Sequence, residues 1–149
     1  MFDLDVNYLK GKKILDCPAG ASSFTAELSK YGYNVVATNI FYDNDPDILK
    51  KKCKVELSKV MQALSKVEDM YIWKYFRAPA QLKECRMTTY LKFIKHYRRE
   101  KGNRYIKSEL TKFPFTDNEF SLILSSHFLF LYDDRLSYDF HKDSIQEML

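Results

Sequence analysis

Small and polar residues gather just after a short apolar run near the start of the chain. The run 13–16 ends in the carboxylate of Asp16, and Gly20 and Ser22 follow within a few positions. Glycine lets a backbone pass close to a ligand, and free N–H groups at a helix start are donors at a positive dipole end. These residue types suit the binding of a nucleotide. Only one glycine is present, so spacing alone supports a ligand site and a plain tight turn about equally.

The residues around this turn predict a β-α-β unit. The apolar spacing of residues 24–31 predicts a helix over 22–31, which Gly32 ends. The run 33–38 is apolar and rich in β-branched residues, which is typical of a buried parallel strand. In such units the turn after the first strand is where nucleotides bind.

The rest of the chain predicts a long helical insertion followed by two more strands. Asp45-Pro46 indicates a helix start, and the helical spacing of apolar residues predicts helix over the whole of residues 45–101. A crossover between parallel strands needs only about a dozen residues, so most of this segment is surplus. Residues 104–108 and 120–125 are the expected third and fourth strands. Residues 135–149 should form a final helix, with an apolar side made of Phe140, Ile145 and Leu149.

The expected fold class is therefore α/β: a Rossmann-like, mostly parallel sheet of about four strands with a helical insertion between strands two and three. The 149 residues, 46% hydrophobic and 30% charged, indicate one globular domain over 1–149 that contains the insertion 45–101. No apolar run approaches the roughly 20 residues that span a bilayer, and the acidic start lacks signal-peptide features. We therefore expect a cytoplasmic protein with no membrane partner.

Cysteines and charges narrow the function classes further. Cys17, Cys53 and Cys85 are widely spaced without a CxxC motif, which predicts reduced thiols and no metal site. The net charge of +4 is modest, and the basic runs 50–54 and 98–104 are typical of solvated helix faces. No nucleic-acid recognition motif is present, so a nucleic-acid partner remains a minor alternative.

Two segments resemble class I S-adenosylmethionine-dependent methyltransferases. Residues 14–24, Ile-Leu-Asp-Cys-Pro-Ala-Gly-Ala-Ser-Ser-Phe, are similar to the first motif of those enzymes. More narrowly, they resemble an uncharacterised bacterial branch with an Asp-Cys-Pro-(Ala/Gly)-Gly turn. Residues 113–130 resemble the run that leads into the fourth strand of these enzymes. The resemblance covers most of the chain and implies S-adenosylmethionine as cofactor and methyl transfer to an unidentified small-molecule nucleophile.

The resemblance also implies which residues bind the cofactor. They follow the four expected strands: Asp16, Pro18, Ala19, Gly20, Ser22, Asn39, Ile40, Glu109, Leu110 and Ser126. Asn39 departs from the family, which usually has an acid here for the ribose hydroxyls. An amide still hydrogen-bonds a hydroxyl, but without the charge-assisted part. Glu109 stands where the family's acid meets the adenine amino group, which donates to a carboxylate.

The substrate pocket is expected beneath a helical cap formed by the insertion. Within the aromatic cluster 71–76, Tyr71 and Trp73 are the residues expected to reach the site, while the others pack the inserted helices. His127, at the end of strand four, is the one histidine placed to act as a general base. The alternative for His127 is a structural hydrogen bond, and no other catalytic residue is assigned.

The chain also departs from the family beyond strand four, where a fifth strand and an antiparallel pair would follow. Strand four then becomes a sheet edge with unpaired backbone groups, which predicts a homo-oligomer formed through that edge. A second function remains open for a chain of this kind. It is a non-catalytic cofactor-binding or interaction protein derived from a truncated methyltransferase.

Overall fold

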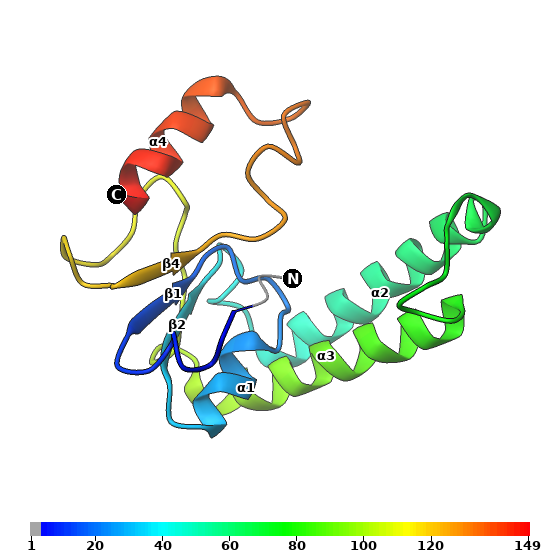
Figure 1. The fold of residues 1–149 in the computed structure, drawn as a ribbon, viewed down its shortest axis with the longest axis horizontal. Helices are drawn as coiled ribbons and strands as arrows, with labels where there is room; N and C mark the ends of the chain where they lie inside the picture. The colour runs from blue at the N-terminus through cyan, green and yellow to red at the C-terminus, as the bar shows by residue number, and fades with distance from the viewer. Residues whose placement is uncertain (1–3) are drawn as a thin grey trace.

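The computed structural model describes residues 4–149 and shows an α/β fold (Figure 1). In chain order the elements are β1 (Lys13–Asp16), α1 (Phe24–Lys30), β2 (Asn34–Thr38), α2 (Pro46–Leu64), the 3-10 turn η1 (Glu68–Met70), α3 (Pro79–Glu100), β3 (Tyr105–Ile106), β4 (Leu122–Leu124) and α4 (Tyr138–Met148). The four strands are parallel in the order β3-β2-β1-β4. The expected Rossmann-like class is confirmed, with the helical insertion between β2 and β3. Of the expected domain 1–149, residues 1–3 lie outside the described part.

The centre of the sheet is β1, which pairs with β2 on one side and β4 on the other. Ile14 lies opposite Val35 of β2 and Leu122 of β4. Its side chain is fully buried in a cluster with Val35 and Leu124, against which Phe24 of α1 packs. The first and second strands form as expected because their apolar side chains fill this core beneath α1.

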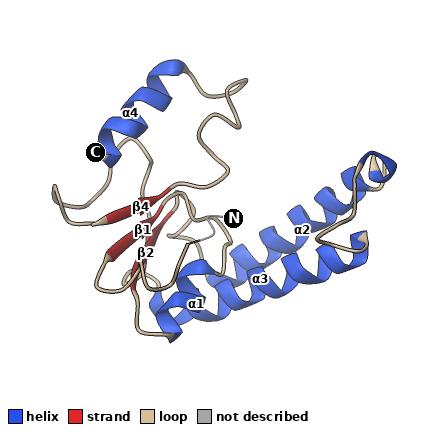
Figure 2. Ribbon diagram, viewed as in Figure 1, coloured by secondary structure: helices blue, strands red, loops and turns tan. Residues whose placement is uncertain are grey.

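The helices α2 and α3 form a long antiparallel hairpin that projects well beyond the sheet (Figures 1 and 2). Its root is anchored on the sheet: Phe93 and Tyr97 near the end of α3 are buried against Ala37 of β2 and Tyr105 of β3. The last turns of α3 are thus the crossover helix of a β-α-β unit, on the same face as α1. The surplus residues of the insertion make α2 and the first half of α3.

Local hydrogen bonds set several boundaries that periodicity placed differently. The expected helix over 22–31 begins at Phe24, whose N–H donates to the Ser22 hydroxyl over 3.1 Å and keeps Ser22 in the turn. The helix expected over 135–149 begins at Tyr138, because the Ser137 hydroxyl accepts from the Phe140 N–H over 3.1 Å and caps it. The third and fourth strands are shorter than expected.

The apolar side expected for the final helix was wrong. Leu149 is fully exposed and Ile145 is 38% exposed, whereas His141 and Ser144 are buried. The helix packs on the preceding loop instead of on a sheet face. Phe130 stacks on His141 with ring centroids 5.2 Å apart. Periodicity identifies an apolar stripe, but the surface that is available decides which side is covered.

Two further features concern the edge of the sheet and the length of the helices. β4 is an edge strand of the sheet, as expected, because among residues 4–149 it pairs with β1 alone. Among residues 4–149, no helix is long and apolar enough to cross a membrane.

Candidate cofactor and substrate site

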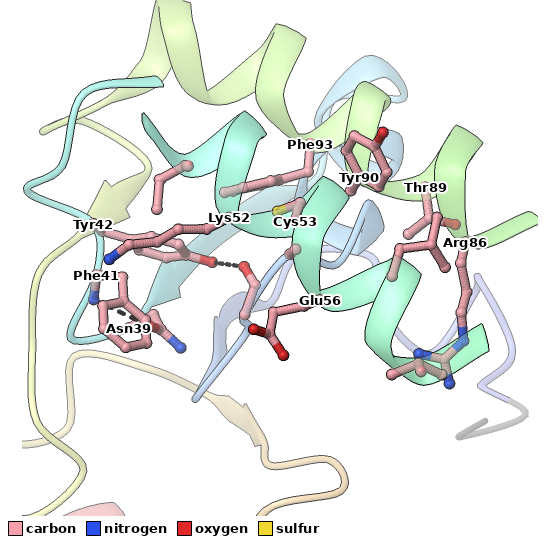
Figure 3. Close-up of a pocket in the computed structure, with 15 residues that line it drawn as sticks. Asn39, Phe41, Tyr42, Lys52, Cys53, Glu56, Arg86, Thr89, Tyr90 and Phe93 are labelled. Carbon is pink, nitrogen blue, oxygen red and sulfur yellow. Dashed lines mark hydrogen bonds between the residues drawn. The ribbon is translucent and has the colours of Figure 1, made fainter. Parts of the chain in front are cut away.

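A cavity of ≈ 710 Å³ opens where the hairpin root meets the carboxyl ends of β1 and β2 (Figure 3). Gly20 and Ala21 come from the turn after β1, and Asn39 and Phe41 follow β2. The opposite wall consists of one side of α2 and one side of α3. This is the edge of a parallel sheet at which α/β proteins bind ligands, and the volume lies within the usual range of ligand pockets.

The turn after β1 is held in place from both sides of the strand. The Cys17 N–H donates to the Leu124 carbonyl of β4, and the Ala19 N–H donates to the Thr38 carbonyl of β2, each over 2.9 Å. The Tyr42 hydroxyl donates to the Gly20 carbonyl over 2.6 Å, as Figure 3 shows. The turn is therefore a fixed wall of the cavity.

Gly20 has a left-handed backbone with φ +58, which favours glycine. A Cβ added there would meet no other atom within 4 Å. Because Gly20 also lines the cavity, this open space is available to a ligand. The structure thus fits the close backbone approach expected at this position.

Asp16 is a buried carboxylate at the end of β1, with 7% of its surface exposed. Its Oδ2 atom has no hydrogen-bond partner among the described residues. Burial raises the pKa of Asp16 to about 7. A buried polar atom without a partner is costly and calls for a physical explanation, such as a ligand that supplies the missing donor.

Cys17, the next residue, is a buried thiol. Burial, with a smaller contribution from the charge of Asp16, raises its pKa to about 12. A thiol of this kind stays protonated and is a poor nucleophile. Cys17 therefore fills the tight turn, and it offers no support for nucleophilic chemistry.

Asn39 is half-buried and has one hydrogen bond within the chain. Its Oδ1 accepts from the Phe41 N–H over 3.1 Å, which holds the turn that leaves β2. Its amide nitrogen donates to no residue of the described chain and remains available to a ligand. Phe41 lines the cavity, with the Lys52 ammonium 4.8 Å from its ring centroid.

Comparison with known proteins places the chain beside an archaeal relative. It is 38% identical over 150 residues to "Uncharacterized protein MJ0045" of Methanocaldococcus jannaschii, a match that covers 100% of this chain and 67% of the relative. The chain belongs to the same family as MJ0045. No protein-family model and no solved structure matches it. The turn, the hairpin and the sheet of this MJ0045-family chain all lie within the matched region.

Only two of the ten residues expected to bind the cofactor line the cavity, namely Gly20 and Asn39. Four of the others belong to the same stretch of chain and support the wall of the cavity without lining it: Asp16, Pro18, Ala19 and Ser22. Ile40 does not line the cavity, whereas its neighbour Phe41 does.

The residues after β3 and β4 do not join this wall. Glu109 is exposed, and the following Leu110 is buried. The Ser126 hydroxyl lies 2.6 Å from Nδ1 of His127, which is exposed and has φ +54. β4 lies on the side of β1 opposite to β2, whereas the cavity follows β2 and the hairpin. For His127, the hydrogen bond at a strand end is what the structure shows.

The placement expected for Tyr71 and Trp73 was wrong. Their rings are 5.9 Å apart at the far end of the hairpin, between η1 and α3, and neither lines the cavity. The reason is geometric. The 19 residues of α2 carry the chain about 28 Å along the helix axis before it turns back.

The hairpin brings in residues that the sequence interpretation missed. Leu57, Tyr90 and Phe93 form an apolar wall, and Glu56 and Arg86 lie farther along the cavity (Figure 3). The Glu56 carboxylate pairs with Lys59 over 2.8 Å. The sequence signal for Leu57, Tyr90 and Phe93 was the apolar spacing of the two helices, and Glu56 and Arg86 had none. Among residues 4–149, no group of three or more His, Cys, Asp or Glu side chains is arranged to hold a metal ion.

Proposed function

We propose that this chain binds S-adenosylmethionine at the Gly20 turn and directs methyl transfer to a nucleophile small enough to enter the cavity. One observation carries the proposal. Gly20 and Asn39 follow different strands, are implied by the methyltransferase resemblance, and line one cavity of ≈ 710 Å³. A plain tight turn would not need such a space beside it.

The residues at this end suit the parts of that cofactor. The open side of Gly20 admits a ligand against the backbone, and the amide of Asn39 donates to a ribose hydroxyl. The ring of Phe41 offers an apolar face to the adenine. Asp16 lies beneath the turn and does not line the cavity, so we assign it to the support of the turn and not to a contact with the cofactor.

The hairpin supplies the acceptor end of the cavity. When bound, the cofactor supplies an electrophilic methyl group on a sulfonium. Alignment of two reactants is most of what such a transfer requires. Leu57, Tyr90 and Phe93 exclude water from this end and hold the acceptor. We assign no general base, and we keep the cytoplasm as the proposed location.

Calorimetric titration with S-adenosylmethionine and S-adenosylhomocysteine tests the proposal. We expect saturable binding of both with one site per chain, and a dissociation constant of about micromolar, which corresponds to roughly 8 kcal/mol. NAD serves as the control ligand, because it shares the adenosine but not the sulfur-linked amino acid. Absence of binding by both sulfur ligands would contradict the proposal and favour the non-catalytic alternative.

We also propose that the chain self-associates through β4. Leu122 and Ile123 are only partly buried, and within the described part of the chain β4 pairs with β1 alone, so its other side presents backbone donors and acceptors. A second copy related by a two-fold axis satisfies them most simply. Sedimentation at micromolar concentration should show a dimer. A monomer throughout that range would mean that the short edge is protected by its own loops.

A further inference from the structure

The charges of the chain are unevenly divided between the hairpin and the rest. Residues 46–100 contain fourteen Lys and Arg and six Asp and Glu, whereas the other residues contain ten and fourteen. The hairpin therefore has a formal net charge of +8 and the rest −4, which together make the +4 of the whole chain. The modest total conceals a strongly basic arm.

Most of the basic side chains on the hairpin have no acidic partner. Three of them pair with carboxylates: Lys59 with Glu56, Lys92 with Glu27, and Arg98 with Asp47. Among residues 4–149 the other eleven form no ion pair. Solvated helix faces in ordinary proteins usually alternate charge signs. An excess of unpaired cations instead provides a site for a polyanion.

Among the described residues, cations without an acidic partner lie at both ends of the arm. Lys50, Lys51 and Lys54 are exposed at the root of α2, beside the cavity, and Lys66 and Lys74 lie at the far end. Along the helix these two groups are about 20 Å apart. A partner that neutralises both groups must therefore be an extended anion and not a single phosphate or carboxylate.

The far end of the arm adds exposed aromatic and apolar side chains. Tyr75 is 86% exposed, Ile72 82%, Met70 81% and Tyr71 55%. Tyr71 lies against Trp73, and Tyr75 meets the edge of Phe76 at 4.8 Å. Unpaired nucleic-acid bases stack on exposed aromatic rings, and neighbouring cations hold the phosphates of the same strand.

A membrane surface would use the same residue types, but the placement argues against it. The far end, residues 65–78, has three cations and two carboxylates, so its own charge is nearly balanced. The root lysines near residue 52 are about 20 Å from it along the helix. That distance exceeds the roughly 8–10 Å over which an anionic surface is felt at physiological salt. A strand lying along the arm reaches both groups.

We propose that the α2–α3 hairpin binds single-stranded RNA, with phosphates along the lysines and unpaired bases on the rings at the far end. RNA loops and ends present this chemistry. The root lysines adjoin Lys52, which lines the cavity, so a bound strand extends from the far end of the arm to the mouth of the cavity. The inference is independent of methyl transfer, because binding along the arm does not need the cofactor.

Fluorescence anisotropy of a labelled 20-nucleotide oligouridylate, measured against the full chain over a range of salt, tests the inference. We expect the triple variant Lys50→Gln, Lys51→Gln, Lys54→Gln to bind at least about tenfold more weakly at 0.1 M salt. Its slope of log affinity against log salt should be shallower by about 2, since each single-strand phosphate contact contributes roughly 0.7. Tyr75→Ala should weaken binding about tenfold with the salt slope unchanged.

The matched control removes the same charge from the rest of the molecule through Lys10→Gln, Lys112→Gln and Lys142→Gln. These lysines belong to no ion pair within the described chain, so both triples should unfold at similar temperatures. The control triple should bind RNA like the parent. Three results would overturn the inference: no binding at low salt, equal weakening by the two triples, or binding to phosphatidylserine vesicles without binding to RNA. None of them bears on the titration with S-adenosylmethionine.

Discussion

The Gly20→Val variant should bind S-adenosylmethionine and S-adenosylhomocysteine roughly 100-fold more weakly than the parent, which corresponds to about 2.7 kcal/mol. Gly20 lines the cavity, and its missing side chain faces open space with no protein atom within 4 Å. The branched methyl groups of valine would occupy the volume that the proposed ligand needs. Calorimetry on the two proteins measures the loss directly.

Gly32→Val is the matched control for this prediction. Gly32 also has a left-handed backbone, with φ +80, and a Cβ added there meets nothing within 4 Å. Both variants therefore carry a similar conformational cost of about 1–2 kcal/mol, which should appear as similar falls in Tm. Gly32 ends α1 and does not line the cavity. The Gly32→Val variant should therefore bind S-adenosylmethionine and S-adenosylhomocysteine with the affinity of the parent. A folded Gly20→Val protein with parental affinity would remove the site from this turn.

Replacing Asp16 by Asn should remove a large pH dependence from the stability of the unliganded chain. Burial raises the pKa of Asp16 from its ordinary value of 3.8 to about 7. Between these two values the folded state keeps a proton that the unfolded state has released, so the free energy of unfolding falls as pH rises. This loss of stability is absent below about pH 4 and complete above about pH 7. From pH 5 to pH 8 it amounts to about 3 kcal/mol.

Urea unfolding of the parent and of Asp16→Asn at pH 5 and pH 8 measures this difference. The parent should lose about 3 kcal/mol over the interval beyond any loss in the variant. Asp117→Asn makes the same substitution at an exposed aspartate in a turn, and it should leave the parental difference in place. If Asp16→Asn kept the full difference as well, the responsible group would lie elsewhere.

The part of the fold that the sequence predicted is the part that local patterns determine. β1, α1 and β2 follow from an apolar run, a helical spacing and a β-branched run, and each pattern spans only a few residues. The capping pair Asp45-Pro46 is also confirmed, since the Asp45 carboxylate accepts from the Asp47 N–H over 2.8 Å. The direction of the hairpin could not be predicted in this way. It depends on Phe93 and Tyr97 packing against Ala37 of β2, which is distant in sequence.

The same division applies to the cavity. Gly20 and Asn39 were predicted because the carboxyl ends of neighbouring parallel strands meet at one edge of a sheet. Glu56 and Arg86 were missed because nothing in the sequence pairs a position on α2 with one on α3 until the two helices lie side by side. Trp73 was misplaced for a related reason. The aromatic cluster around Trp73 suggested a pocket, but the length of α2 determines how far Trp73 lies from the cavity.

The uneven division of charge between hairpin and sheet also makes the molecule an electric dipole. Its positive end is the projecting arm (Figure 1), and its negative end is the body that contains the cavity turn. In the field of an anionic partner such a molecule rotates before contact, since the arm is attracted while the body is repelled. Orientation is thus selected during approach, and physiological salt confines this selection to separations of about 8–10 Å or less. Two positively charged arms repel each other, so two copies of the chain that pair through β4 should hold their arms apart.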